Sequence, residues 1–496
     1  MKIPRLVIAG THSGVGKTTL ATGLMAALKK RERPIQGYKV GPDYIDPSYH
    51  AAATGLASRN LDRWLLGEHL PSVFAQNVGD RWAVIEGVMG MFDGMSGTAG
   101  FGSTADVAKL LQAPIILIVD ASSMSRSVAA LVHGFNTYDP AVNLQGVILN
   151  RVKSSAQEKI LREALNEIQI PVLGVLPKEA ALHLPERHLG LVPVGEGGLL
   201  AGFIDTLSRL VSKHIDLEQV ERIMLGAPDL DESFLAPRSS QPKVQESELV
   251  QLKLNIETSV GESTPTEAEY GGPLPLEEVG VLRLDKFRLG LALDEAFLFY
   301  YQDALDLAKR MNFIVVPFSP LHDMTLPPDL DGIFIGGGFP ELHLDRLSKN
   351  LTFLDSLRSY AASGKPVYAE CGGYMYLGRS ITDFEGREFP LAGLIPMKAE
   401  MTTRLQGIGY RRGVLREDTF LGPRGTTVQG HEFHYSRVTF DQEFPPAYEL
   451  FKGDQSARME GYAQDNIVAS YLHLHFSGQS ELLENWFSSR SRRIGV

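Results

Sequence analysis

The chain of 496 residues contains one cysteine, Cys371, whose sequence surroundings suit a nucleophile. The thiol lies in Tyr-Ala-Glu-Cys-Gly-Gly (368–373), directly after an apolar, strand-like run. An acidic residue, a thiol and two glycines after a strand are typical of a sharp strand-to-helix turn, which exposes a side chain at the carboxyl edge of a parallel sheet. A lone cysteine is more often a small buried hydrophobe, but this turn favours attack on a carbonyl carbon.

A cysteine nucleophile needs a base, and two histidines are candidates. His473 and His475 both lie in the strand-like run 469–476. In a single strand they would be two residues apart and share a face, so spacing alone does not choose between them.

A second chemical site is predicted at residues 10–19, Gly-Thr-His-Ser-Gly-Val-Gly-Lys-Thr-Thr, which follow the first predicted strand and open a helix. In that setting a glycine-rich loop binds phosphates through backbone N–H groups and the helix N-terminus. Lys17 would reach the β- and γ-phosphates of a nucleotide, and the Thr18 hydroxyl would ligate Mg²⁺. The spacing departs from the usual pattern, because Thr11 stands where the first glycine is expected. The predicted nucleotide-binding residues of this loop are Gly14, Gly16, Lys17, Thr18 and Thr19.

Two further segments are predicted to reach the same phosphates, because both leave strands at the carboxyl edge of the sheet. Lys39 and Asp46 lie in one turn-rich stretch, and Glu86 ends a strand. Mg²⁺ prefers oxygen ligands, so Thr18, Asp46 and Glu86 are the predicted metal ligands; solvated loop carboxylates or helix caps are the alternative for the two acids. Asn150 follows another strand and would either meet the nucleotide base or belong to an ordinary loop.

These side chains can meet only if their strands end at one edge of a sheet, and the sequence predicts such an arrangement. From residue 5 to about 225, short apolar strands alternate with amphipathic stretches of helix length, which predicts a parallel, doubly wound α/β sheet. Residues 227–285 are polar, acidic and proline-rich, as expected of a flexible linker. We therefore predict an α/β protein with two domains, 1–226 and 286–496. The predicted strands are 5–9, 36–40, 82–86, 115–120, 145–150, 172–176, 288–293, 313–317, 332–336 and 366–370.

The net charge of the chain limits the classes of molecule that it can bind. Lys and Arg number 48 against 59 Asp and Glu, a net charge of −11, so no broad basic surface is available for nucleic acid or anionic lipid. Apolar runs such as 113–119 are shorter than a membrane span, and no signal-peptide pattern precedes the first strand. One cysteine excludes an internal disulfide, which agrees with a reducing cytoplasm. We predict a cytoplasmic protein that binds neither nucleic acid nor membrane.

Together with the loop, the glutamate and the cysteine, several longer motifs resemble the cobyrinate a,c-diamide synthase family of glutamine-dependent corrin amidases. The resemblance covers almost the whole chain except the linker. The amino-terminal half also resembles dethiobiotin synthetase, whose phosphate loop has the same longer form. The motifs are Lys-Val-Gly-Pro-Asp-Tyr-Ile-Asp-Pro (39–47), Ser-Arg-Asn-Leu-Asp (58–62), Arg-His-Leu-Gly-Leu (187–191), Gly-Gly-Gly-Phe-Pro-Glu-Leu-His (336–343), Gly-His-Glu-Phe-His-Tyr-Ser (430–436) and Tyr-Leu-His-Leu-His-Phe (471–476).

The resemblance implies a division of labour between the two domains. The first, a P-loop sheet, would bind ATP, Mg²⁺ and the corrinoid and phosphorylate acetate side chains, with Lys17 and Lys39 neutralising charge. Tyr44 and Asp46 would lie beside the corrinoid, so Asp46 would serve substrate, metal or both. The second would be a class I glutamine amidotransferase-like α/β domain that supplies ammonia.

In that second domain the resemblance implies that Cys371 attacks the glutamine amide. His473 is favoured as the base because it occupies the family's Tyr-Leu-His position, with His475 as the alternative. Many class I amidotransferases carry a carboxylate two residues after this histidine. It is missing here, so a Cys–His dyad is predicted.

Two glycine- and histidine-rich segments complete the predicted site. The backbone N–H groups of Gly337, Gly338 and Gly372 are candidate oxyanion donors, although a tight turn after a strand would use glycines equally well. The cluster His431, Glu432 and His434 has the composition of a metal site, and glutamine binding or a packed turn explains it as well.

The predicted function is ATP-dependent amidation of the a and c acetates of cobyrinate, with ammonia from glutamine, in cobalamin biosynthesis. Close relatives handle hydrogenobyrinate and nickel-sirohydrochlorin, and the sequence does not distinguish these substrates. A nucleotide-switched regulatory protein with a degenerate amidotransferase domain is a different class of function, and the intact Cys371 and His473 argue against it. The predicted partners are a tetrapyrrole polycarboxylate, glutamine and ATP, and a homodimer is left open.

Overall fold

Seven parallel strands form the sheet of the amino-terminal half, in the order β3-β2-β4-β1-β5-β6-β7. The computed structural model describes residues 1–95, 98–178, 197–231, 286–453 and 458–490. The six strands predicted for this half are confirmed, and β3 is an additional strand of three residues, too short to stand out in the sequence. The strands are β1 (Arg5–Gly10), β2 (Ile35–Val40), β3 (Arg59–Leu61), β4 (Trp82–Glu86), β5 (Ile115–Asp120), β6 (Leu144–Val152) and β7 (Val172–Pro177).

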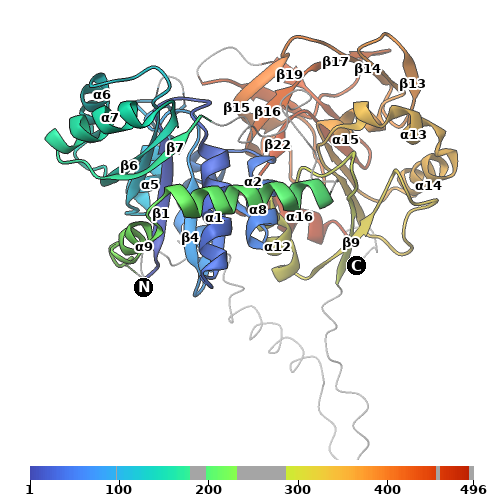
Figure 1. Ribbon diagram of the computed structural model, residues 1–496. Helices are drawn as coiled ribbons and strands as arrows, with labels where there is room; N and C mark the ends of the chain where they lie inside the picture. The colour runs from blue at the N-terminus through green and yellow to red at the C-terminus, as the bar shows by residue number, and fades with distance from the viewer. Residues whose placement is uncertain (96–97, 179–196, 232–285, 454–457, 491–496) are drawn as a thin grey trace, which may run out of the picture.

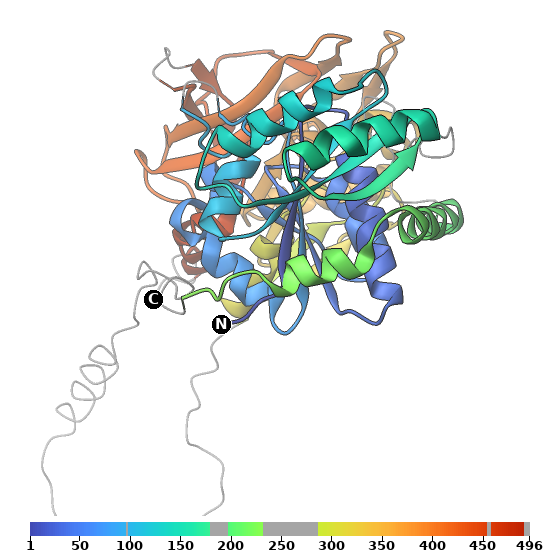
Figure 2. The ribbon, with the colours of Figure 1, turned by 60° about the vertical axis from the view of Figure 1, so that its left-hand side comes forward.

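Helices cover both faces of this sheet, which is why most residues of its strands are apolar and buried. Figures 1 and 2 show α8 running across the sheet beside α1. One face carries α1 (Lys17–Lys30), α2 (Asp46–Thr54), α8 (Gly197–His214) and α9 (Leu217–Leu225), and the other α4 (Leu70–Val78), α5 (Thr104–Leu110), α6 (Ser127–Thr137) and α7 (Ser155–Glu167). The first half is therefore doubly wound, as predicted.

A second, six-stranded sheet begins at β8 and has the order β20-β21-β11-β10-β8-β9, with β20 antiparallel. Its strands are β8 (Phe287–Ala292), β9 (Phe313–Phe318), β10 (Gly332–Ile335), β11 (Val367–Glu370), β20 (Tyr462–Gln464) and β21 (Ile467–Ser470). Its helices are α12 (Gln302–Arg310), α13 (Leu344–Lys349), α14 (Leu351–Ala362), α15 (Gly372–Leu377) and α16 (Glu481–Ser488), with the 3₁₀ turns η3 (Pro340–Leu342) and η4 (Phe476–Gly478).

Two smaller sheets form the β-rich end. The first contains β12 (Ser380–Thr382), β13 (Glu388–Pro390), β14 (Met397–Met401) and β17 (Ser436–Phe440). The second contains β15 (Gly407–Leu415), β16 (Thr427–His434), β18 (Tyr448–Phe451), β19 (Arg458–Glu460) and β22 (His473–Leu474).

The run 469–476 is not one strand, contrary to the prediction. β21 ends at Ser470, whose hydroxyl accepts a hydrogen bond from the Leu472 backbone N–H at 3.0 Å. A serine that bonds the backbone two residues on makes a local turn. The chain then joins another sheet as β22, and His475 precedes η4.

The two halves lie side by side (Figure 1) and meet through the segment around β3. Arg59 donates to Asp303 at 3.1 Å and to Asp306 at 2.5 Å, both on α12. Asp62 caps the short helix α3 (Arg63–Leu66) and accepts a hydrogen bond from the Tyr410 hydroxyl at 2.7 Å. The motif 58–62 therefore joins the halves.

The predicted linker, 227–285, lies largely outside the described residues. Its first residues pack on the sheet, since Leu230 is buried and bonds the backbone of Met1. The motif 187–191 also lies outside the described residues. In the described parts of the chain, no helix has the length and apolarity to cross a membrane.

Candidate functional site

The predicted phosphate loop connects β1 to α1. Gly14 and Gly16 have φ values of +79° and +99°, a conformation that glycine adopts without steric cost. Gly16 caps α1, so the helix N-terminus opens onto the loop. Lys17 donates to the backbone carbonyls of His12 and Met89, which holds its ammonium over the loop. This geometry suits phosphate binding.

The loop opens into a cavity of about 530 Å³ between β-strand ends and α8. All the residues predicted to bind nucleotide or metal line it, namely Gly14, Gly16, Lys17, Thr18, Thr19, Lys39, Asp46, Glu86 and Asn150. Asp43 also lines it, whereas Tyr44 does not.

Glu86 is the centre of a buried charge network at the floor of this cavity. Its carboxylate accepts hydrogen bonds from the Thr18 hydroxyl at 2.7 Å and from the Lys39 ammonium at 2.9 Å. Its second oxygen lies 2.6 Å from Nε2 of His50. Lys39 also contacts Asp46 at 2.7 Å. The sequence interpretation missed His50, which lies four residues after Asp46 and so on the same face of α2.

The network shifts the acid–base behaviour of its members. Burial would raise the pKa of Glu86, but Lys39 and His50 hold it well below its usual range. Burial and the neighbouring Glu86 raise the pKa of Asp46 to about 7, against the opposing effect of Lys39. Burial and the charge of Lys39 lower the pKa of Lys17 to about 8.

The oxygens of Thr18, Asp46 and Glu86 converge on one region, as Mg²⁺ ligands would. Within the described residues, no group of three or more His, Cys, Asp and Glu side chains is arranged to hold a metal ion. Two carboxylates and a hydroxyl would leave the rest of a Mg²⁺ shell to phosphate oxygens or water.

Asn150 holds the phosphate loop. Its side-chain amide donates to the Val15 carbonyl at 2.8 Å. The neighbouring Arg151 pairs with Asp120 at 2.5 Å and donates to the Gly14 carbonyl at 2.9 Å. Both residues, near the carboxyl end of β6, thus fix the loop from the side of the cavity.

Cys371 lies on a strained turn between β11 and α15. Its φ of +48° is unusual for a residue with a side chain, and its N–H donates to the Ser470 carbonyl at 2.8 Å. The sulfur lies 3.9 Å from the Phe433 carbonyl oxygen. The predicted sharp turn between a strand and a helix is present.

His473 lies against this cysteine. Burial would lower the pKa of His473, but hydrogen bonds with Cys371 and Glu370 raise it to about 10. Nδ1 lies 3.5 Å from Glu370 Oε2. Glu370 is therefore a carboxylate neighbour that the predicted dyad did not include, although it precedes Cys371 in the same motif.

His475 lies elsewhere. Its ring stacks on Tyr301 with 4.3 Å between centroids, and burial lowers its pKa to about 3. The strand β22 ends at Leu474, between the two histidines, and of the two it is His473 that lies against Cys371.

The glycines predicted to hold an oxyanion surround this pair. A Cβ atom on Gly337 would lie 2.5 Å from His473 Cε1, and one on Gly372 would lie 3.1 Å from the Gly338 nitrogen. A side chain is thus excluded at Gly337, beside His473, and at Gly372, beside Gly338.

The cluster 431–434 separates into different contacts. His431 stacks on His473 with 4.9 Å between ring centroids, whereas His434 stacks on Tyr471. Glu432 pairs with Arg411 at 2.7 Å and with Arg458. The three side chains do not form a metal site.

Tyr44 lies between the halves. Its ring stacks on Phe299 with 5.0 Å between centroids and 7° between planes, and it also packs on Tyr301 and His431. The hydroxyl faces His473. A residue predicted to contact the corrinoid thus contacts the other domain.

Comparisons with known proteins match both halves. Residues 6–192 match the CobQ/CobB/MinD/ParA nucleotide binding domain, and residues 288–481 match the CobB/CobQ-like glutamine amidotransferase domain. A cobyrinate a,c-diamide synthase of Dehalococcoides mccartyi (strain CBDB1) is 39% identical over 98% of both chains. One of Priestia megaterium is 38% identical, over 97% of this chain and 96% of the relative. A hydrogenobyrinate a,c-diamide synthase of Streptomyces coelicolor is 42% identical, over 96% and 95%.

Proposed function

The chain belongs to the cobyrinate a,c-diamide synthase family, and we propose that it is a glutamine-dependent ligase of cobalamin biosynthesis. Its substrate would be cobyrinate or hydrogenobyrinate, whose a and c acetate carboxylates become amides. The observation that carries the proposal is one chain with both a phosphate-loop cavity and a strained cysteine beside a histidine. A catalytic cysteine that must stay reduced agrees with a protein located in the cytoplasm.

The first domain would activate the carboxylate. A carboxylate is a poor acyl donor, because its leaving group would be oxide. Its oxygen therefore attacks the γ-phosphorus of ATP, ADP leaves, and an acyl phosphate forms. Lys17 and Lys39, which line the cavity, neutralise the phosphate charge, and the loop fixes its position.

Thr18, Asp46 and Glu86 would hold Mg²⁺, which supplies charge neutralisation at the phosphates. The Lys39 ammonium lies between the two carboxylates, 2.7 Å from Asp46 and 2.9 Å from Glu86. Its charge offsets the charges of these two buried acids.

The second domain would release ammonia from glutamine. The Cys371 thiolate attacks the side-chain amide carbon, and the oxyanion is held by backbone N–H groups of Gly337, Gly338 and Gly372. His473 gives its proton to the departing ammonia, and a thioester remains. Water then attacks the thioester with His473 as base, and glutamate leaves. The ammonia displaces phosphate from the acyl phosphate to form the amide.

Incubation with Mg·ATP, glutamine and one tetrapyrrole at a time tests this function. Mass spectrometry should detect two amides on cobyrinate or hydrogenobyrinate, and nickel-sirohydrochlorin serves as the third arm. Lys17→Ala should abolish amide formation and retain glutamine hydrolysis. Failure to hydrolyse glutamine or to amidate any of the three would contradict the proposal.

A further inference from the structure

Glu370 places a carboxylate inside the second domain, next to His473. It is 2% exposed. Oε1 accepts hydrogen bonds from the Tyr368 hydroxyl at 2.8 Å and from the Leu474 N–H at 2.9 Å. Oε2 lies 3.5 Å from His473 Nδ1. One oxygen is thus held by two neutral donors, and the other faces the imidazole.

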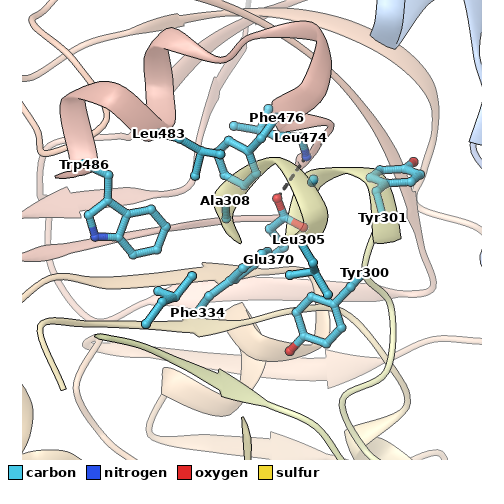
Figure 3. A pocket seen from close by; sticks show the side chains of 12 residues that line it. Tyr300, Tyr301, Leu305, Ala308, Phe334, Glu370, Leu474, Phe476, Leu483 and Trp486 are labelled. Carbon is cyan, nitrogen blue, oxygen red and sulfur yellow. Dashed lines mark hydrogen bonds between the residues drawn. The ribbon is translucent and has the colours of Figure 1, made fainter. Parts of the chain in front are cut away.

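The surroundings of this carboxylate are apolar. Figure 3 shows Glu370 among Phe334, Leu305, Leu483 and Phe476, with the bond from Leu474 drawn. The adjoining cavity measures about 10 Å³, roughly the space that one water needs. Bulk water therefore does not solvate the carboxylate, and a buried charge of this kind requires a partner.

We propose that Glu370 is the positioning residue for His473. It accepts the Nδ1–H bond, which fixes the tautomer and orientation of the ring and leaves Nε2 for the Cys371 thiol. It also stabilises the imidazolium that forms when the thiol gives up its proton. The inference rests on the proposed glutaminase function.

The usual place for such a carboxylate, two residues after the histidine, holds His475. Neither of its ring nitrogens has a hydrogen-bond partner among the described residues, and its ring stacks on Tyr301. The strand β11 instead brings in the carboxylate from the residue before the nucleophile. Cysteine and carboxylate therefore reach the histidine from one strand end.

The other groups that face His473 do not supply this charge. Tyr44, from the loop after β2, presents a hydroxyl at 3.4 Å from Nδ1. His431, from β16, stacks on the ring, and burial with the neighbouring His473 and His475 holds its pKa well below the usual value. Within the described residues, Glu370 is the carboxylate that pairs with His473.

The test is Glu370→Gln in the full-length chain. Glutamine keeps the acceptor for Tyr368 and Leu474 but presents an N–H donor to Nδ1, which favours the tautomer that cannot accept the thiol proton. Glutamine hydrolysis should fall by about 10²- to 10⁴-fold, as for loss of an orienting carboxylate elsewhere. Amidation with ammonium chloride should be unchanged, because it bypasses His473.

A second readout separates positioning from folding. The chain has one cysteine, so iodoacetamide alkylation reports on Cys371 alone. In Glu370→Gln, the pH of half-maximal alkylation rate should rise by about one to three units, because the imidazolium loses a close opposite charge. An unchanged midpoint with near-wild-type glutamine hydrolysis would overturn the inference.

Glu460→Gln is the matched control. Glu460 is also buried and accepts a backbone N–H, that of Tyr471, at 2.9 Å, but burial and Glu432 raise its pKa to about 8. It is therefore mostly protonated at pH 7, and its replacement should leave hydrolysis and alkylation unchanged. An equal loss in this control would overturn a specific role for Glu370.

If Glu370→Gln does not fold, Glu370→Asp is the variant that tests the inference. It keeps the negative charge and moves it away from His473 by the length of one methylene group. Reduced glutamine hydrolysis with intact ammonia-dependent amidation supports the inference, and wild-type hydrolysis overturns it. If the wild-type chain hydrolyses no glutamine at all, the proposed function fails instead, so the two failures are distinguishable.

Discussion

The Tyr44 hydroxyl lies 3.4 Å from Nδ1 of His473, although the two residues belong to different halves of the chain. Two residues after Tyr44, Asp46 contacts Lys39 in the nucleotide cavity. Asn60 holds this loop by donating to the carbonyls of Gly41 and Asp43 at 2.8 and 2.7 Å. One short loop therefore touches both candidate sites.

Tyr44→Phe should lower the rate of glutamine hydrolysis by up to about tenfold, because a neutral hydrogen bond contributes about 0.5–1.5 kcal/mol. The ring stacking on Phe299 is retained, and ammonia-dependent amidation should not change. Steady-state kinetics of both reactions measure this. A raised KM for the tetrapyrrole with normal glutamine hydrolysis would instead support the corrinoid contact predicted from the sequence.

Cys371→Ala should abolish glutamine-dependent amidation and leave an ammonia-dependent ligase. The thiol lies on the amidotransferase turn, whereas the cavity for ATP is formed by the other half. Amide formation with glutamine and with ammonium chloride, compared at saturating Mg·ATP, measures the difference. Loss of both activities in a folded variant would contradict the separation of the two sites.

Local motifs were readable from the sequence, whereas contacts between distant segments were not. The phosphate loop and Glu86 lie together in the structure because strand ends meet at one sheet edge. The Asp62–Tyr410 bond joins residues 348 positions apart, and no periodicity encodes it. Glu370 was visible beside Cys371, but its approach to His473 depends on where the turn at Ser470 sends β22.

Metal-dependent activity should weaken as pH falls through about 7. Burial and Glu86 raise the pKa of Asp46 to about 7, and a protonated carboxyl is a poor Mg²⁺ ligand. About tenfold fewer Asp46 side chains are ionised at pH 6 than at pH 8. The Mg²⁺ dependence of ammonia-driven amidation measures this without His473. Asp46→Asn is the control, since it keeps the titrations of ammonia, the nucleotide and Lys17 and removes that of Asp46; an identical pH profile for both proteins would contradict the prediction.

Arg59→Met should destabilise the contact between the halves. Asp303 is buried and would keep only the amide of Asn77, which donates at 2.7 Å. Breaking a buried pair costs about 3–5 kcal/mol, and we expect the lower value because Asp303 can take up a proton. The thermal midpoint should fall. Arg126→Met removes an exposed pair with Glu167 and should not change it; equal midpoints for both variants would refute a structural role for Arg59.

The positive φ of Cys371 belongs to the turn that presents the reactive thiol, and it lowers the stability of the ligase's fold. Alanine normally stabilises a protein relative to glycine by about 0.5–1 kcal/mol inside helices and strands, but alanine at 371 would keep the backbone strain, which is worth about 1–3 kcal/mol. Cys371→Gly should therefore unfold at a higher denaturant concentration than Cys371→Ala, the reverse of the usual order. If Cys371→Ala unfolded at the higher denaturant concentration instead, the backbone of this turn would not be strained. Without selection for ammonia release, glycine at this position would increase folding stability. Cysteine is therefore retained here at a cost in folding stability.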